Sequence, residues 1–196
     1  MSDVRAAVVV LAAGQAARMG EPKQLIEFRG KPLVRHVADT ACRAGYDAAF
    51  IVVGAYESHV RRVLRGCAGT VVVNSDWEKG IGTSIRCAVE AVGAVADSFT
   101  LVLADQPYVT QRAMGTLLTT HLVTTAPVVA SRYEGTVGVP ALFHKSVFAE
   151  LLALGDDEGC KRVIRAHSAE AAFLDMPDAA FDVDTPADVR RLHQVG

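Results

Sequence analysis

The sequence predicts an α/β fold in which a mostly parallel sheet lies between layers of helices. Apolar segments alternate with amphipathic ones along the first half of the chain, in the order β-α-β-α-β. The apolar segments are continuous, which is typical of parallel strands that helices cover on both faces. The 196 residues, 51% of them hydrophobic, can bury a full core within one domain. We therefore expect a single domain over residues 1–196.

Each expected element has its own pattern. Apolar runs predict strands at residues 6–12, 48–53, 70–73, 99–104 and 126–130. Apolar residues at helical spacing predict helices at 32–45, 56–66, 110–122, 145–154, 160–166 and 186–193. Thr110 is a candidate N-cap for the third of these helices, and Pro186 can start the last. A segment with two glycines, residues 132–143, predicts a hairpin.

Charge and cysteine usage argue against several classes of function. The formal net charge is -2 with both signs interspersed, so we expect no nucleic-acid partner, and any bound phosphate should belong to a small molecule. The cysteines include no Cys-x-x-Cys pair, so we expect neither a zinc site nor a disulfide framework, but reduced thiols in the core. The first apolar run is short and soon ended by glycine, which predicts a cytoplasmic protein without a signal peptide or a membrane partner.

The segment LAAGQAARMGEPKQL, residues 11–25, follows the first expected strand. Ligands of open α/β sheets bind beyond the carboxyl ends of the strands. Gly14 and Gly20 allow the backbone to approach a polyphosphate closely, and peptide N–H groups in such a loop bind anions. Arg18 and Lys23 add positive charge. The residues alone leave two interpretations open, a solvated basic turn and a phosphate cradle.

Two familiar phosphate motifs are not present in this segment. A Walker loop needs Gly-Lys-Ser/Thr at the start of a helix, and a dinucleotide fingerprint needs Gly-x-Gly-x-x-Gly. Pro22 stands directly before Lys23 and disfavours a helix that runs through the lysine. We therefore expect an extended loop that folds over its ligand.

Aspartates occupy two further positions of interest. Asp105 directly follows the strand 99–104, where a carboxylate can point out of the sheet edge. Near the C-terminus, Asp182, Asp184 and Asp188 precede or begin the last helix. Asp184 is either the N-cap of that helix or a metal ligand. Two carboxylates from distant parts of the chain, together with a phosphate-type loop, suit a magnesium nucleotide, so we infer Mg²⁺ as the cofactor.

Six blocks of the sequence, taken together, resemble the MobA-like nucleotidyltransferase family and especially its molybdenum cofactor cytidylyltransferase branch. The blocks are LAAGQAARMGEPKQL, NSDWEKGIGTSI, LVLADQP, GTVGVPALF, DDEGCKRVI and DVDTPADV. They extend over nearly the whole chain, and the first block together with ADQP is specific. The resemblance implies a Rossmann-like three-layer α/β/α sandwich of the nucleotide-diphospho-sugar transferase type.

The resemblance also implies a reaction, in which CMP passes from CTP to the phosphate of Mo-molybdopterin and pyrophosphate leaves. CTP and Mo-molybdopterin would be the substrates, and a molybdoenzyme or its maturation chaperone would receive the product. Carried over to this chain, the nucleotide-binding residues would be Leu11, Ala12, Ala13, Gly14, Arg18, Lys23, Gly82, Thr83 and Ser84. The magnesium ligands would be Asp105 and Asp184, and the catalytic residues Arg18, Lys23 and Asp105.

Alternatives remain beside this interpretation. They are a guanylyl transferase of the same family, a cytidylyltransferase for a small phosphorylated alcohol, and a non-catalytic nucleotide-binding maturation factor. LAAG rather than LAGG favours the cytidylyl branch, because a methyl group at Ala13 discourages a purine. Trp77 is either a stacking surface for a ring of the substrate or a packing anchor.

Overall fold

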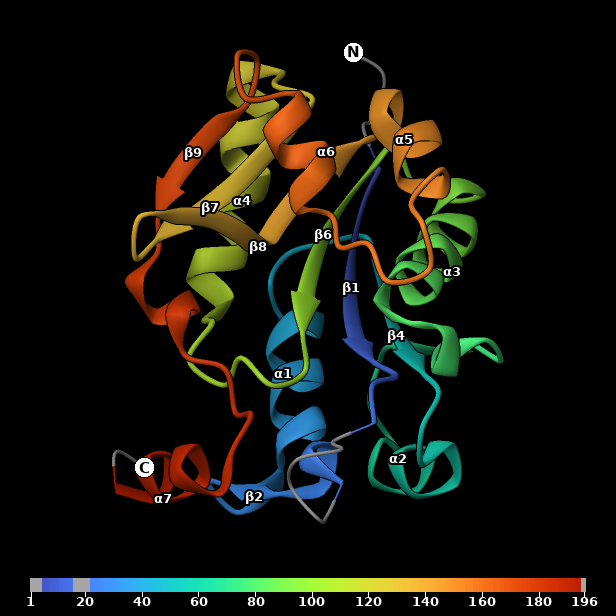
Figure 1. Ribbon diagram of the computed structural model, residues 1–196, viewed down its shortest axis with the longest axis vertical. Helices are drawn as coiled ribbons and strands as arrows, with labels where there is room; N and C mark the ends of the chain where they lie inside the picture. Colours follow the sequence, from blue (N-terminus) through green and yellow to red (C-terminus); the bar gives the residue numbers. More distant parts are fainter. Residues whose placement is uncertain (1–4, 16–21, 195–196) are drawn as a thin grey trace.

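The computed structural model describes residues 5–15 and 22–194, and a seven-stranded sheet runs through them (Figure 1). The strand order is β5-β4-β1-β6-β8-β7-β9. Strands β4, β1, β5 and β6 are parallel, whereas β8 is antiparallel to both of its neighbours and β9 is parallel to β7. The strands are β1 (Ala6–Ala12), β4 (Ala48–Val53), β5 (Thr70–Val73), β6 (Ser98–Leu103), β7 (Val128–Tyr133), β8 (Thr136–His144) and β9 (Ala172–Asp175).

Helices cover both faces of this sheet. They are α1 (Leu33–Cys42), α2 (Glu57–Val63), α3 (Ile81–Gly93), α4 (Gln111–Thr124), α5 (Phe148–Leu152), α6 (Lys161–Ala166) and α7 (Pro186–Gln194). A short hairpin of β2 (Glu27–Phe28) and β3 (Lys31–Pro32) precedes α1. The predicted Rossmann-like architecture with a mostly parallel sheet is therefore confirmed. Within the described residues, no helix combines the length and the hydropathy that crossing a bilayer requires.

Strand β1 shows why its apolar run is continuous. Val9 and Leu11 pack into the cluster formed with α3, α5 and α6, while Val8 and Val10 pack into the cluster formed with α1, α2 and α4. All of these side chains are buried. Because successive residues of a strand point to opposite faces, a strand covered on both sides needs apolar residues throughout.

Several local expectations can be compared with the structure. Thr110 is the N-cap of α4, since its hydroxyl accepts a hydrogen bond from the Ala113 N–H at 3.1 Å. The expected hairpin exists, with Glu134 and Gly135 at its turn, both at positive φ. Its first strand merges with the expected strand at 126–130 to form β7.

Helix α3 and strand β9 were not expected from the sequence, and neither was the short hairpin of β2 and β3. The start of α3 contains glycines, which are typical of loops. Strand β9 has only a short apolar segment, and polar residues flank it in the sequence. The cysteines are free thiols, as expected, but only Cys160 is fully buried. Cys42 and Cys67 lie at the surface of the core with their Sγ atoms 3.7 Å apart.

A third, smaller cluster lies beyond the carboxyl end of β1, where α7 packs beside β2 (Figure 1). The ring of Tyr108 stacks edge-on against Phe28 at 5.9 Å and lies 5.0 Å from the ring of Phe181. Ile26 and Val183 are also buried in this cluster. It therefore joins three segments of the chain that are far apart in sequence.

Candidate active site

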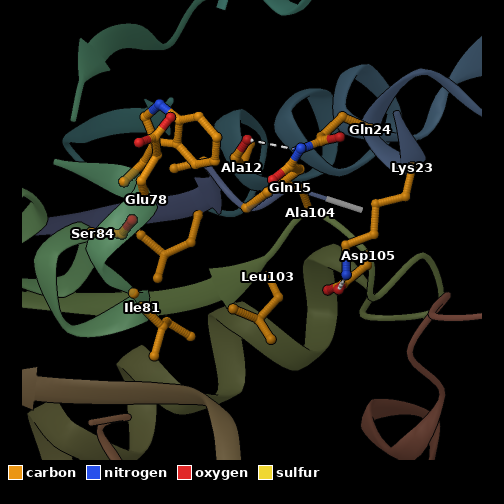
Figure 2. A pocket seen from close by; sticks show the side chains of 15 residues that line it. Ala12, Gln15, Lys23, Gln24, Glu78, Ile81, Ser84, Leu103, Ala104 and Asp105 are labelled. Atoms are coloured by element: carbon orange, nitrogen blue, oxygen red, sulfur yellow. Dashed lines mark hydrogen bonds and ion pairs between the residues drawn. The ribbon is translucent and has the colours of Figure 1, made fainter. Parts of the chain in front are cut away.

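A cavity of about 490 Å³ opens at the carboxyl ends of β1 and β6. Its walls are formed by residues 11–15, 23–24, 77–78, 80–81, 84 and 103–105. Figure 2 shows Glu78, Ile81 and Ser84 on one side of it, and Lys23, Gln24 and Asp105 on the other. The volume is within the range of small-molecule sites, and the position matches the rule for ligands of open α/β sheets.

Three charged side chains meet at one end of the cavity. The Lys23 ammonium donates to Asp105 Oδ2 and lies 3.1 Å from Asp184 Oδ1. Burial alone lowers the pKa of Lys23, but the Asp105 and Asp184 carboxylates outweigh burial and raise this pKa above its usual value. Lys23 is therefore positively charged at neutral pH.

The small third cluster positions these charges. Each charged residue lies within three positions of a member of this cluster. The pairs are Lys23 with Ile26, Asp105 with Tyr108, and Asp184 with Val183. Lys23 itself begins a single 3₁₀ turn, Lys23–Leu25, so the chain is not extended at the lysine. Residues 16–21 of the expected loop lie outside the described residues. The backbone is extended at Pro22, with φ -63° and ψ 107°, and the turn then closes with the Leu25 N–H donating to the Pro22 carbonyl at 2.9 Å.

The structure bears on one of the two roles considered for Asp184, that of N-cap. Asp188 Oδ2 accepts hydrogen bonds from the Thr185 N–H at 2.9 Å and from the Asp184 N–H at 3.3 Å. The Asp188 N–H in turn donates to the Thr185 hydroxyl at 3.3 Å. This reciprocal pair caps the start of α7. The Asp184 side chain is not needed as a cap and is directed to Lys23 instead.

The donor set fits a divalent cation. Asp105 and Asp184 converge on a single cationic group, and hard carboxylate oxygens are what Mg²⁺ and Mn²⁺ bind. Asp105 Oδ1 is buried and has no hydrogen-bond partner within the described part of the chain. No group of three His, Cys, Asp or Glu side chains arranged to hold a metal occurs among residues 5–15 and 22–194. A bound cation would therefore take its remaining ligands from water or phosphate.

Asp182 is a neighbour of this site that the sequence did not single out as functional. Burial, together with the nearby Asp105 carboxylate, raises the pKa of Asp182 to about 6. Its Oδ1 atom is buried and has no hydrogen-bond partner among the described residues. The site thus concentrates negative charge around Lys23, which favours an additional cation.

The predicted nucleotide contacts fall into three groups. Leu11, Ala12, Ala13, Gly14, Lys23 and Ser84 line the cavity. Gly82 and Thr83 lie behind its wall: the Gly82 N–H donates to the Asp156 carbonyl at 2.7 Å, and the Thr83 hydroxyl donates to the Gly80 carbonyl at 2.7 Å. Arg18 lies outside the described residues, as does Gly20.

Three further lining residues were not predicted as contacts or were left undecided. Trp77 lines the cavity and also packs, partly buried, against the main cluster on the α3 face, so it serves as a packing anchor at the cavity wall. Glu78 is exposed at the rim. Gln24 is buried beside Lys23. The one sequence indication that it lies at the site is that it directly follows Lys23 in the block LAAGQAARMGEPKQL.

The sheet, the cavity at its carboxyl edge and the cluster of one lysine and two aspartates define an α/β domain of the nucleotide-binding class. The chain belongs to the family of MobA-like NTP transferase domains, which it matches over residues 8–171. Members of this family are nucleotidyltransferases that act on nucleoside triphosphates, and a divalent metal is typical of them. The family and the enzyme class predicted from the sequence are thereby confirmed.

Solved and curated relatives agree with this assignment. The crystal structure of Rv0371c from Mycobacterium tuberculosis H37Rv is 30% identical, with a TM-score of 0.86 over 98% of this chain and 100% of that chain. A crystal structure of Rv0371c in complex with manganese has 30% identity and a TM-score of 0.82 over the same shares of both chains.

Among curated proteins, nicotine blue oxidoreductase from Paenarthrobacter nicotinovorans is 35% identical over 114 residues, which are 58% of this chain and 55% of that protein. The bifunctional protein GlmU from Streptomyces coelicolor is 36% identical over 126 residues, 62% of this chain and 26% of that protein. The chain thus spans about half and about a quarter of the length of these two relatives.

Proposed function

We propose that this nucleotidyltransferase is a molybdenum cofactor cytidylyltransferase that uses CTP, Mg²⁺ and Mo-molybdopterin. The observation that carries the proposal is the convergence of Lys23, Asp105 and Asp184 at the end of a cavity next to the strand β1. The six sequence blocks that resemble the cytidylyltransferase branch support the choice of substrates. A molybdoenzyme or its maturation chaperone would then receive the product.

The reaction needs no activated side-chain nucleophile. A phosphate oxygen of the acceptor attacks the α-phosphorus of CTP, a new P–O bond forms, and the bond from the α-phosphorus to the bridging oxygen of the leaving pyrophosphate breaks. The chain's residues contribute position and charge. Lys23 would neutralise the departing pyrophosphate, and the backbone of residues 12–14 would hold the nucleotide. We assign Arg18 the same role as Lys23 on the resemblance alone.

Asp105 and Asp184 would hold the magnesium ion. When bound, the ion would supply charge neutralisation on the phosphate oxygens. The buried, unpartnered Oδ1 of Asp105 within the described part of the chain supports this assignment, because a buried carboxylate oxygen otherwise bears an uncompensated cost. The manganese complex of Rv0371c shows that a relative binds a divalent cation.

The residues that line the cavity support a pyrimidine. Ala13 and Trp77 crowd the same place: a Cβ atom at Gly54 would lie 3.0 Å from the Ala13 methyl group and 2.5 Å from Trp77 Cβ. Both side chains line the cavity. The Ala13 methyl group at the cavity wall is what favours a small base over a purine.

The test is pyrophosphate release with each NTP and Mg²⁺, with and without Mo-molybdopterin, and with Asp105→Ala as the control. Release with CTP and the pterin together, and its loss in the control, is the expected result. Release with GTP instead would place the chain in the guanylyl branch. Release with CTP only when a small phosphorylated alcohol is supplied would indicate that different acceptor. Binding of CTP without turnover on any acceptor would indicate a maturation factor.

A further inference from the structure

Gln24 is a buried amide between the end of β1 and the Lys23 turn. Its side chain is nearly inaccessible, with 2% of the residue exposed. The Nε2 group donates to the Gly14 carbonyl at 2.5 Å and to the Ala12 carbonyl at 3.2 Å, and Figure 2 shows the bond to Ala12 as a dashed line. Gln24 thus joins the turn that carries Lys23 to the segment that lines the cavity.

The effect on the cavity is electrostatic. Carbonyl oxygens carry partial negative charge and would repel a polyphosphate, whereas peptide N–H groups attract it. In this segment three successive carbonyls have protein donors: Ala12 and Gly14 bond to Gln24, and Ala13 accepts from the Ala55 N–H at 2.9 Å. Within the described residues, nothing accepts from the Gly14 N–H. The segment is therefore held with its acceptors satisfied, and no described residue occupies this donor.

Only one orientation of the Gln24 side-chain amide is stable. Gln24 Oε1 is buried and has no hydrogen-bond partner among the described residues. Turning the amide over would place this oxygen against two carbonyl oxygens and would leave both of them without their donor. The chain thus leaves one buried acceptor unsatisfied in order to direct Nε2 to the cavity segment.

We infer that Gln24 is a positioning residue that sets nucleotide affinity without touching the nucleotide. It holds residues 12–14 in the shape that binds phosphate, so its loss should weaken the binding of the triphosphate and leave the chemical step largely intact. The inference rests on the proposed function only in taking a nucleoside triphosphate as the ligand.

Gln106 provides a matched control, because it is also a buried glutamine beside the site. It is 1% exposed, its Nε2 donates to the Ala179 carbonyl at 3.0 Å, and its Oε1 is likewise without a partner in the described part of the chain. Its amide does not reach residues 12–14. Gln106→Leu therefore removes a comparable buried amide without disturbing the cavity segment.

The experiment compares Gln24→Leu, Gln106→Leu and the unchanged protein. Calorimetric titration with CTP and with GTP, each with Mg²⁺, gives Kd, and thermal unfolding monitors the fold. We expect Gln24→Leu to raise Kd about tenfold, as loss of hydrogen bonds to the cradle implies. KM for the nucleotide should rise in parallel while kcat changes less than about threefold. Gln106→Leu should lower Tm by about as much as Gln24→Leu does. It should leave Kd for the nucleotide within about twofold of the value for the unchanged protein.

The inference is overturned if folded Gln24→Leu binds CTP and GTP as the unchanged protein does, or if both variants raise Kd equally. If Gln24→Leu does not fold, Gln24→Glu decides. Its carboxylate keeps the volume but places negative charge against the two carbonyls, and an unchanged Kd in this variant would also overturn the inference. Failure of the proposed function is a distinct result. In one case the unchanged protein would bind the nucleotide without transferring it. In the other it would bind neither CTP nor GTP, and the inference then falls as well.

Discussion

The Lys23 ammonium lies 3.1 Å from the Asp184 carboxylate, although 161 positions separate the two residues in the chain. The same ammonium also contacts Asp105, 82 positions away. One positive and two negative side chains leave this group with a net negative charge. The group is therefore suited to accept a divalent cation together with an anionic substrate.

Loss of either Lys23 or Asp105 should remove most of the activity. Removing one preorganised electrostatic partner costs on the order of 100- to 1000-fold in turnover, or roughly 3 to 4 kcal/mol. We expect Lys23→Ala and Asp105→Ala to fold normally and to release pyrophosphate at this reduced rate. Lys145→Ala, which removes an exposed ion pair with Asp97, is the control and should keep full activity. Near-normal rates in both site variants would refute the roles assigned to these residues.

Asp184→Asn should weaken the binding of a divalent cation. The substitution keeps the size of the side chain but removes a negative oxygen ligand, and we expect the affinity for Mn²⁺ to fall on the order of tenfold or more. Electron paramagnetic resonance of free Mn²⁺ measures this without any substrate. Asp97→Asn changes an exposed carboxylate in an ion pair with Lys145 and serves as the control. Equal Mn²⁺ affinity in the two variants would exclude Asp184 as a ligand.

Gly82→Ala should destabilise the protein through backbone crowding. A Cβ atom at Gly82 would lie 2.0 Å from the Gly155 carbonyl oxygen and 2.8 Å from that of Asp156. We expect a loss of about 1 to 3 kcal/mol in the free energy of unfolding. Gly93 ends the same helix, and a Cβ atom there would meet nothing within 4 Å. Gly93→Ala should be neutral or slightly stabilising in urea denaturation, and equal effects of the two substitutions would contradict the crowding.

His36 should make folding sensitive to mild acid. Burial, with the charges of Arg29 and Lys31 nearby, lowers the pKa of His36 below its usual 6.5, although a hydrogen bond with the Pro107 backbone opposes this. The folded state therefore binds fewer protons than the unfolded chain, so stability is present above pH 6.5 and is lost as the pH falls below it.

We expect His36→Gln to reduce the decrease in unfolding free energy between pH 7 and pH 5, measured by urea denaturation at each pH. His144, whose pKa is also lowered by burial, should retain part of the dependence. His59→Gln, at an exposed position of α2, is the control and should leave the slope unchanged. A slope in His36→Gln equal to that of the unchanged protein would contradict the assignment.

The parts of the fold that follow from local patterns could be predicted from the sequence. Strand β1 reads as one apolar run because helices cover both of its faces, and α1 shows its apolar residues at helical spacing. Helix α3 could not be predicted in the same way. Gly80 and Gly82 are required where the backbone of residues 155–156 packs against its first turn, and that contact is a property of the tertiary structure.

The site shows the same division. Lys23 and Asp105 follow strands and were predicted as site residues, and the topology brings them together. That Asp184 is not needed as the cap of α7 depended on Thr185 and Asp188, whose capping bonds become visible only in the structure. Gln24 has backbone carbonyls as its partners, and the identity of such partners leaves no trace in the sequence.

The match to the family ends at residue 171, whereas β9, α7 and Asp184 all come after that point. A gene fragment trimmed to the matched segment would lack one edge strand of the sheet, the second carboxylate facing Lys23 and part of the small aromatic cluster behind it. Such a fragment could retain much of the sheet and still be inactive. Domain limits drawn from family similarity are thus narrower than the unit that holds the proposed active site.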